Sequence, residues 1–407
     1  MMQAVLSNAA HPEYGVAAIP VPIPMGEYDH VVELLEALEV GSATQRDCQV
    51  DEIRGAWPVL KRLEGNPVNL DELDYLTKRL DSFDVGEAAQ FQAMAEKLDL
   101  NGMTDLIYLT FCCQQVTVIA DFTDLEAVGR NHYMNLNGGC ASTEDLNNLD
   151  GCETALLLID SGAGTITPYG VVYDNGMKLE HIYDGSHLPE FFYENCIASI
   201  SLSLEGCPDK CEKLYFPCAD SKIDRALRRL GAERPSQCAA KLDTDQLCDA
   251  VRGMFEEEFE LNEHLDTLNA LARCYQGFDA QTLDKFHTVF DTAWPQTPEE
   301  ALYLAENIHD FTVVNGISTA EEYGRYMIQE SGHFELDPNL EDYVDFESYG
   351  KRRIQEEHGI LGDRGYVAYL GMDSEVKEIM SRNIPSEQHS QGQQLIWRFQ
   401  TGRFQPV

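Results

Sequence analysis

The feature that most constrains the fold of this chain is an internal repeat. When the 407-residue sequence is shifted by 195 positions, it aligns with itself without gaps. The matching pairs run through both halves: Pro22 and Pro217, Asp29 and Asp224, Leu70-Asp71 and Leu265-Asp266, Phe83-Asp84 and Phe278-Asp279, Phe91 and Phe286, Gly129-Arg130 and Gly324-Arg325, Asp150 and Asp345, Gly170 and Gly365. Self-similarity at one offset is the signature of a repeated structural unit. The sequence therefore predicts two diverged copies, about 1–195 and 196–390.

The first part of each copy has the pattern of short strands followed by a helix. Residues 3–23 and 197–217 are apolar, and the prolines at 20, 22 and 24 favour edge strands because proline donates no hydrogen bond to a sheet. Apolar side chains then recur at helical spacing, which predicts a helix: Tyr28, Val31, Val32, Leu35 and Leu38.

A helical stretch over about 69–133 follows. Asn69 and Glu72 have the spacing of a capping box at its start. The first apolar face consists of Leu70, Leu73, Leu76, Leu80 and Phe83. Such a stripe predicts packing in a core and carries no further function.

The third part of the copy reads as mixed. The continuous apolar run Ala155–Ile159 predicts a buried strand. Gly170–Tyr173 and Met177–Leu179, joined through Asn175-Gly176, predict a hairpin.

The expected fold class is α+β, in an elongated multidomain chain built from two copies of a small-sheet, helical-bundle and mixed unit. The predicted boundaries are 1–65, 66–135 and 136–195 in the first copy, 196–260, 261–332 and 333–390 in the second copy, and a tail at 391–407.

Charge restricts the partners. The chain has 70 Asp and Glu against 29 Lys and Arg, a formal net charge of −41. This sign disfavours direct binding of nucleic acids and of anionic membranes, so a positively charged protein surface is the expected partner. Both copies are acidic, with 32 acidic against 9 basic residues in 1–195 and 38 against 20 in 196–407. An acidic surface kept for solubility is the simpler alternative, although ordinary soluble surfaces mix both signs.

Cysteine spacing and hydropathy predict a cytoplasmic protein without a cofactor. The twelve cysteines form no paired CxxC clusters, so reduced and mostly buried thiols are expected. A zinc site at Cys207, Cys211 and Cys218 is the alternative. No run of about 20 apolar residues and no signal peptide is found.

The second copy carries motifs that can be compared with a known family. Three motifs follow one another along the chain. The first is Glu322-Tyr323-Gly324-Arg325-Tyr326-Met327-Ile328-Gln329-Glu330-Ser331-Gly332, and the second is Leu336-Asp337-Pro338-Asn339-Leu340-Glu341-Asp342-Tyr343-Val344-Asp345-Phe346-Glu347-Ser348-Tyr349-Gly350. The third is Gly365-Tyr366-Val367. These residues resemble the C-terminal half of the ArdA antirestriction proteins. The resemblance covers about 262–370 and extends more weakly to 70–173.

The resemblance implies an elongated protein from a mobile genetic element. Its acidic face would mimic bent B-form DNA and occupy the DNA site of type I restriction-modification enzymes. Family members of ordinary length pair through their C-terminal domain, so the two copies here could form a single-chain pseudo-dimer; a homodimer is the alternative. The first copy departs from the pattern, having 147–154 in place of the Tyr-x-Asp-x-x-x-Tyr-Gly segment, which puts its share in inhibition in doubt.

The candidate partner-binding residues are the carboxylates of the matching segment. They are Glu321, Glu322, Glu330, Asp337, Glu341, Asp342, Asp345 and Glu347. Phosphate mimicry would distribute the binding energy over many weak contacts, so no single residue is expected to dominate. Tyr343, Tyr349 and Gly350 are expected to pack and to form turns that hold the acidic segment.

Two other functions remain open. An acidic scaffold or inhibitor could bind another basic DNA-processing partner, such as a CRISPR effector, a nucleoid protein or a transfer-complex component; competition by duplex DNA would separate it from a mimic. The run from Leu157 to Ala163 also resembles the Asp-Ser-Gly loop of aspartic proteases, with Asp160 as the acid. Those enzymes need two such aspartates, and the repeat places Gln355 opposite Asp160.

Overall fold

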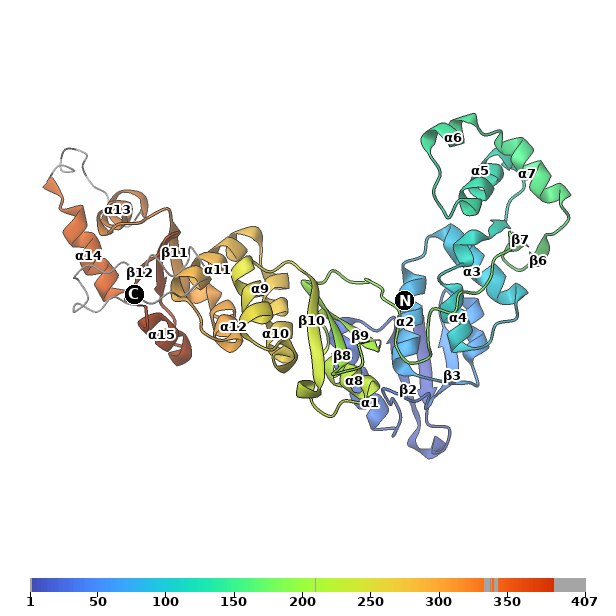
Figure 1. Ribbon diagram of the computed structural model, residues 1–407, viewed down its shortest axis with the longest axis horizontal. Coiled ribbons are helices and arrows are strands. Elements are labelled where there is room, and N and C mark those ends of the chain that lie inside the picture. The colour runs from blue at the N-terminus through green and yellow to red at the C-terminus, as the bar shows by residue number, and fades with distance from the viewer. Residues whose placement is uncertain (1, 209, 333–336, 338, 340–342, 384–407) are drawn as a thin grey trace. The chain divides into compact units, whose positions relative to one another are not determined.

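The computed structural model describes residues 2–208, 210–332, 337, 339 and 343–383. The predicted tail 391–407 lies outside this part of the chain, as do Glu341 and Asp342. The chain divides into two compact units, Met1–Asp245 and Gln246–Val407. Figure 1 shows the helices and strands of each unit along the chain.

Unit 1 begins with a four-stranded antiparallel sheet of order β2-β1-β3-β4. Ala17, Ile19 and Val21 of the edge strand β2 are buried, and Pro20 lies on the same strand, where its missing N–H breaks no central hydrogen bond. The predicted edge strand and the helix after it are therefore confirmed. The elements are β1 (Met2–Ser7), β2 (Val16–Val21), α1 (Met25–Glu36), β3 (Cys48–Arg54) and β4 (Pro67–Val68).

Three helices follow the sheet and share its hydrophobic core. They are α2 (Leu70–Asp81), α3 (Val85–Lys97) and α4 (Met103–Leu109). The Asn69 side chain accepts hydrogen bonds from the N–H groups of Asp71 (2.9 Å) and Glu72 (3.3 Å), so it caps α2 as predicted. The Glu72 carboxylate binds Arg46 and Tyr183 instead of closing the capping box.

The predicted helical stretch does not continue to residue 133, because strand β5 (Thr117–Ile119) interrupts it. β5 is the first strand of a sheet of order β5-β7-β6, in which β7 (Gly170–Tyr173) pairs with both β5 and β6 (Thr165–Thr167). Three helices complete this part: α5 (Leu125–Leu136), α6 (Thr143–Asn148) and α7 (Gly151–Asp160).

Two sequence predictions for this part were wrong. The run Ala155–Ile159 lies in helix α7, because Asp150 caps its N-terminus through the N–H of Glu153 (2.9 Å) and because burial follows the helical spacing of Ala155 and Leu158. The hairpin is β6–β7. The turn at Asp174–Met177 forms, with Met177 N donating to Asp174 O, but no strand follows it.

The last part of unit 1 is a three-stranded sheet of order β10-β8-β9 with one helix. The elements are β8 (Ala198–Leu204), β9 (Cys211–Phe216), α8 (Asp220–Leu230) and β10 (Cys238–Asp245). α8 contacts α1 and α2 through charged side chains. Asp29 accepts hydrogen bonds from the N–H groups of Asp220 (3.2 Å) and Ser221 (2.9 Å) at the start of α8.

A buried ion cluster holds this sheet against α2. Asp71 lies 3.0 Å from Arg225 and 2.6 Å from Arg229, and Arg229 also pairs with Glu212 at 2.8 Å. Burial alone would raise the pKa of Asp71, but Arg229 and Arg225, with the Tyr28 hydroxyl, lower it to about 2. Asp71 is therefore ionised in the folded protein at neutral pH.

Unit 2 contains a helical part and a second mixed part. The helical part consists of α9 (Asp249–Gly253), the π-helical turn η5 (Met254–Glu258), α10 (Leu265–Gly277), α11 (Ala280–Ala293) and α12 (Pro298–Glu306). The mixed part has a sheet of order β11-β13-β12. Its elements are β11 (Phe311–Asn315), α13 (Ala320–Arg325), the π-helical turn η8 (Tyr326–Glu330), α14 (Phe346–Glu356), β12 (Ile360–Leu361), β13 (Gly365–Tyr369) and α15 (Ser374–Ser381).

The order of elements in the first half recurs in the second. Helices α2 and α10 begin at Leu70 and Leu265, which the repeat pairs, and β7 and β13 begin at Gly170 and Gly365. The two mixed parts also share one strand order, since β5-β7-β6 corresponds to β11-β13-β12. Several small antiparallel sheets with helices confirm the predicted multidomain α+β class.

The twelve cysteines are all free, but only five of them are buried, fewer than expected. Within the described residues, no group of three or more His, Cys, Asp or Glu is arranged to hold a metal ion, so the zinc alternative at Cys207, Cys211 and Cys218 has no support. In the described part of the chain, no helix combines the length and apolarity that a membrane span requires.

Candidate partner-binding surface

The candidate surface is built on the close packing of α13 against α14. A Cβ atom on Gly324 would lie 2.0 Å from the carbonyl oxygen of Phe346, and one on Gly350 would lie 1.8 Å from that of Ala320. Any side chain at these positions would collide with backbone, so glycine is required. Gly350 thus serves in packing, as predicted, although it lies inside a helix and forms no turn.

Substituting one of these glycines tests the packing. We expect Gly324→Ala to lower the free energy of unfolding of unit 2 by about 1–3 kcal/mol, because the helix backbones must move apart. Gly277→Ala, at the end of α10 where a Cβ meets no atom within 4 Å, is the matched control. It should leave stability unchanged or raise it by up to about 1 kcal/mol. Urea unfolding followed by circular dichroism gives both values; equal stabilities for the two variants would contradict the packing.

Two tyrosines and a glutamate fix α13 and α14 against the sheet. The rings of Tyr323 and Tyr366 stack with 3.9 Å between their centroids, and both hydroxyls donate to the same Glu357 oxygen at 2.6 Å. Burial, followed by the bond to Glu357, raises the pKa of both tyrosines. Glu357 also pairs with Arg353, so its charge is used inside the protein and is not available to a partner.

Two predicted site residues act as helix caps. Glu322 accepts from the N–H groups of Ser318 (2.8 Å) and Thr319 (3.0 Å), which closes a capping box at α13. Asp345 caps α14 by accepting from the N–H of Ser348 at 2.9 Å. These backbone hydrogen bonds lower the pKa of both carboxyl groups. Both groups are exposed and carry a charge, but they also hold the helices in place.

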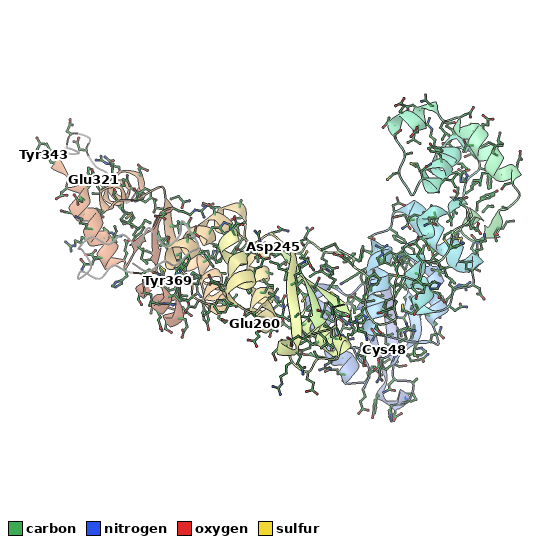
Figure 2. All side chains as sticks on the ribbon, in the orientation of Figure 1. Cys48, Asp245, Glu260, Glu321, Tyr343 and Tyr369 are labelled. Carbon is green, nitrogen blue, oxygen red and sulfur yellow. The ribbon has the colours of Figure 1, made fainter. Side chains whose placement is uncertain are left out.

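The other described candidates are exposed carboxylates. Glu321 pairs with Arg325 at 3.4 Å, and Glu347 pairs with Lys351 at 2.5 Å. Asp337 accepts from the N–H of Asn339 at 2.9 Å. Glu330, at the end of η8, has no ion pair among the described residues. Figure 2 shows Glu321 and Tyr343 toward the same end of unit 2.

The two tyrosines of the acidic segment behave differently. Tyr343 was predicted to pack, which is wrong, since its side chain is 86% exposed. Its neighbour Val344 is partly buried, and the packing of this segment begins at Phe346. Tyr349 is half-buried against the cluster around Tyr323 and Tyr366. Tyr343 is therefore available at the surface.

A second group of exposed carboxylates lies in the first half of the chain, where the sequence showed an excess of acidic residues but no motif that named them as a site. Seven lie exposed on and around α5, α6 and α7: Asp121, Asp124, Glu144, Asp145, Asp150, Glu153 and Asp160. Arg130 is the sole basic residue of the sequence from 121 to 160, and it pairs with Glu126 at 2.8 Å. The repeat could have indicated this group, because it pairs the N-caps Asp150 and Asp345. The motif search passed over it because the Tyr-x-Asp segment is missing.

The protease interpretation of Asp160 does not fit the structure. An aspartic-protease loop follows a strand, whereas Asp160 is the last residue of helix α7 and is exposed to solvent. Its turn is closed by ordinary helix-end bonds, with Ser161 N donating to Leu157 O.

Comparison with known proteins addresses the second copy. Residues 211–368 match the family described as Antirestriction protein (ArdA), a segment that runs from β9 into β13 and includes α13 and α14. No curated protein matches the chain. The matched segment covers less than half of the 407 residues. The resemblance predicted from the sequence is thus confirmed for the C-terminal part of the chain, which carries the ArdA antirestriction family pattern over residues 211–368.

Proposed function

We propose that this protein is an antirestriction protein that mimics B-form DNA and competitively occupies the DNA-binding groove of a type I restriction-modification enzyme. It acts by binding in the cytoplasm, without catalysis and without a cofactor. The proposal rests on the family match at 211–368 together with the charge of that region.

The observation that carries the proposal is the excess of carboxylates around the matched helices. From Glu256 to Gly350 the sequence has 22 acidic residues and only three basic ones, Arg273, Lys285 and Arg325. The described candidates on α13, η8 and α14 are exposed. A groove that evolved to bind phosphates would therefore meet carboxylates that few neighbouring cations neutralise.

The amount of charge is of the right order for a duplex. DNA carries one charge per roughly 1.7 Å of its axis, so 41 net charges correspond to roughly 70 Å, or about 20 base pairs. A restriction enzyme that contacts a site of this length could thus be occupied by one chain.

We also propose that both copies take part, as a single-chain version of the family's dimer. The shared order of elements and the exposed carboxylates of α5–α7 support this proposal. In this proposal, the first copy contributes through its carboxylates, so residues 147–154 do not have to keep the Tyr-x-Asp-x-x-x-Tyr-Gly segment of the family.

The test is inhibition of a purified type I restriction enzyme on an unmodified plasmid. Inhibition should be saturable at one chain per DNA-binding site, and duplex DNA should displace the protein. Inhibition should weaken steeply with salt, because an interface with about six phosphate-like contacts loses roughly 10³-fold in affinity between 50 and 200 mM. Binding that ignores added duplex would instead favour the acidic scaffold.

A further inference from the structure

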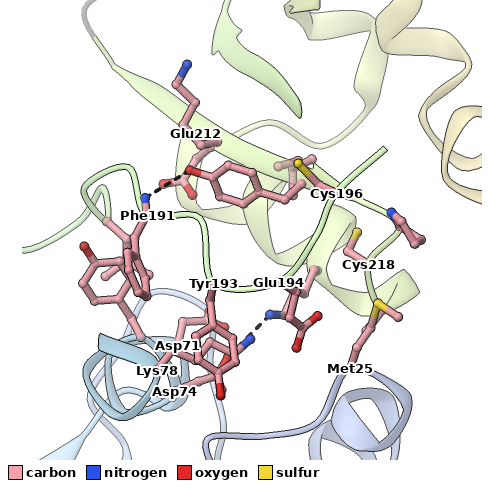
Figure 3. Close-up of a pocket in the computed structure, with 18 of the residues that line it drawn as sticks. Met25, Asp71, Asp74, Lys78, Phe191, Tyr193, Glu194, Cys196, Glu212 and Cys218 are labelled. Atoms are coloured by element: carbon pink, nitrogen blue, oxygen red, sulfur yellow. Dashed lines mark hydrogen bonds and ion pairs between the residues drawn. The ribbon is translucent and has the colours of Figure 1, made fainter. Parts of the chain in front are cut away.

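A cavity of about 150 Å³ lies in unit 1. Helix α2, strand β9, the start of α8 and the connecting segment 188–196 surround it. Figure 3 shows Asp71, Asp74 and Lys78 of α2 together with Phe191, Tyr193 and Glu194 of the connecting segment. A cavity of this size holds one six-membered aromatic ring.

Two lysines in the cavity share one carboxylate. The Lys78 and Lys222 ammonium groups lie 3.2 Å and 3.4 Å from the same Asp74 oxygen. The other Asp74 oxygen accepts from the N–H of Ile23 at 2.9 Å. Burial, and then the neighbouring Lys222, lower the pKa of Lys78, against the attraction of Asp74. Asp74 is the carboxylate that both ammonium groups contact, and Glu194 attracts Lys78 from the rim of the cavity.

The remaining buried charges of the cavity are balanced. Arg229 of the lining, with Arg225 beside it, faces Asp71 and Glu212 in the ion cluster described above, and Lys213 pairs with Asp243 at 2.7 Å. Glu194, at the rim, is exposed to solvent. The ammonium groups of Lys78 and Lys222 are thus the cations that a small anion would contact in this cavity.

Two buried polar atoms of the lining have no protein partner. The Tyr75 hydroxyl and the Glu212 Oε1 oxygen make no hydrogen bond in the structure, although Tyr75 is 8% exposed and Glu212 is 3% exposed. Unpartnered polar groups of this kind are costly, and a bound molecule can satisfy them. Tyr75 can donate or accept, and the Glu212 oxygen can accept.

The walls between these groups are aromatic. Tyr75, Phe191, Tyr193 and Tyr215 line the cavity. Tyr75 and Phe191 meet edge to face, with 6.1 Å between ring centroids, and the Tyr215 hydroxyl accepts from the N–H of Phe191 at 3.2 Å. Such walls favour a flat ring that stacks or packs edge to face.

We propose that this cavity is a binding site for a small aromatic carboxylate. Its carboxylate would ion-pair with Lys78 and Lys222, its ring would lie among the aromatic side chains, and a hydroxyl or amino substituent would satisfy Tyr75 and Glu212. The site goes beyond the proposed antirestriction function, and no step of that function depends on it.

The experiment uses the full-length protein and isothermal titration calorimetry with 4-hydroxybenzoate. We expect one site per chain, with a dissociation constant on the order of 1 mM or tighter. Benzoate should bind more weakly than 4-hydroxybenzoate because it lacks the substituent. Benzylamine should not compete, and inorganic phosphate should compete more weakly than benzoate because it has no ring to place among the aromatic side chains. Competition by benzylamine or equal competition by phosphate would overturn the proposal, as would no binding of either carboxylate.

Two variants locate the site. Lys78→Met should weaken 4-hydroxybenzoate at least tenfold and should fold, because it leaves Lys222 and Asp74 as a balanced pair. Tyr75→Phe keeps the ring and should remove the preference for 4-hydroxybenzoate over benzoate. Lys61→Met, an exposed lysine outside the lining, is the control and should bind like the wild type. Unchanged affinity in both cavity variants would place the binding elsewhere and overturn the assignment.

Discussion

Replacing Glu321, Glu330, Asp337 and Glu347 together by their amides is expected to weaken inhibition of the restriction enzyme by about 10²–10³-fold at physiological salt. Each is exposed and none caps a helix of the described structure, so the fold should survive. The effect of the set should exceed that of any single change, which should stay below about fivefold, because phosphate-like contacts are weak and additive.

The dependence of the inhibition on salt concentration tests the same four residues independently. If all four side chains stand in for phosphates, the slope of log affinity against log salt should fall by about 3.6. Glu33, Glu36, Glu39 and Asp51 form a matched control set with the same change in net charge, since all four are exposed and lie outside the family segment. Equal losses of inhibition in both sets would mean that inhibition depends only on net charge. A single substitution that removes most of the inhibition would contradict a binding energy distributed over many carboxylates.

Asp71→Asn is expected to lower the free energy of unfolding of unit 1 by about 3–5 kcal/mol. The substitution leaves Arg225 and Arg229 buried beside a neutral group, and only Glu212 remains to face them. Urea unfolding of the full chain, followed by circular dichroism, measures the loss. Asp51→Asn, at an exposed position, should change stability by less than about 0.5 kcal/mol.

The difference in the free energy of unfolding between the wild type and Asp71→Asn is expected to depend on pH. The folded pKa of Asp71 is about 2, below its usual value of 3.8, so its charge contributes stability above pH 3.8 that is lost as the pH falls toward 2. The stability gap between the wild type and Asp71→Asn should therefore narrow from pH 5 to pH 2, by about 2 kcal/mol. A stability difference that stays constant from pH 5 to pH 2 would show that the ionised carboxylate of Asp71 does not stabilise the folded protein.

The sequence indicated several of the helices because their signals are local. α2 was predictable because its leucines recur at helical spacing behind a capping asparagine. α7 was not, because Leu156 and Leu157 are 48% and 68% exposed and fill its outer face with apolar side chains, which erases the helical period. The sheet β5-β7-β6 was missed because β5 and β7 pair across some fifty intervening residues.

The candidate surface was only partly predictable. The acidic motif drew attention to α13 and α14, whose candidate carboxylates are exposed. The motif did not reveal that Glu322 and Asp345 cap the helices, or that Tyr343 faces solvent, because these depend on the three-dimensional contacts of each side chain. The carboxylates around Asp150 could have been found from the repeat alone.

The packing of α8 against α2 has a consequence for dividing the protein. The repeat suggests a cut near residue 195, but that cut would separate Asp71 from the two arginines that neutralise it. The N-terminal fragment would keep Asp71 without its arginine partners. The C-terminal fragment would begin with the sheet β10-β8-β9, which would lack its contacts with α2. The boundary between the two compact units follows Asp245, so it does not coincide with the predicted boundary between the two copies at residue 195.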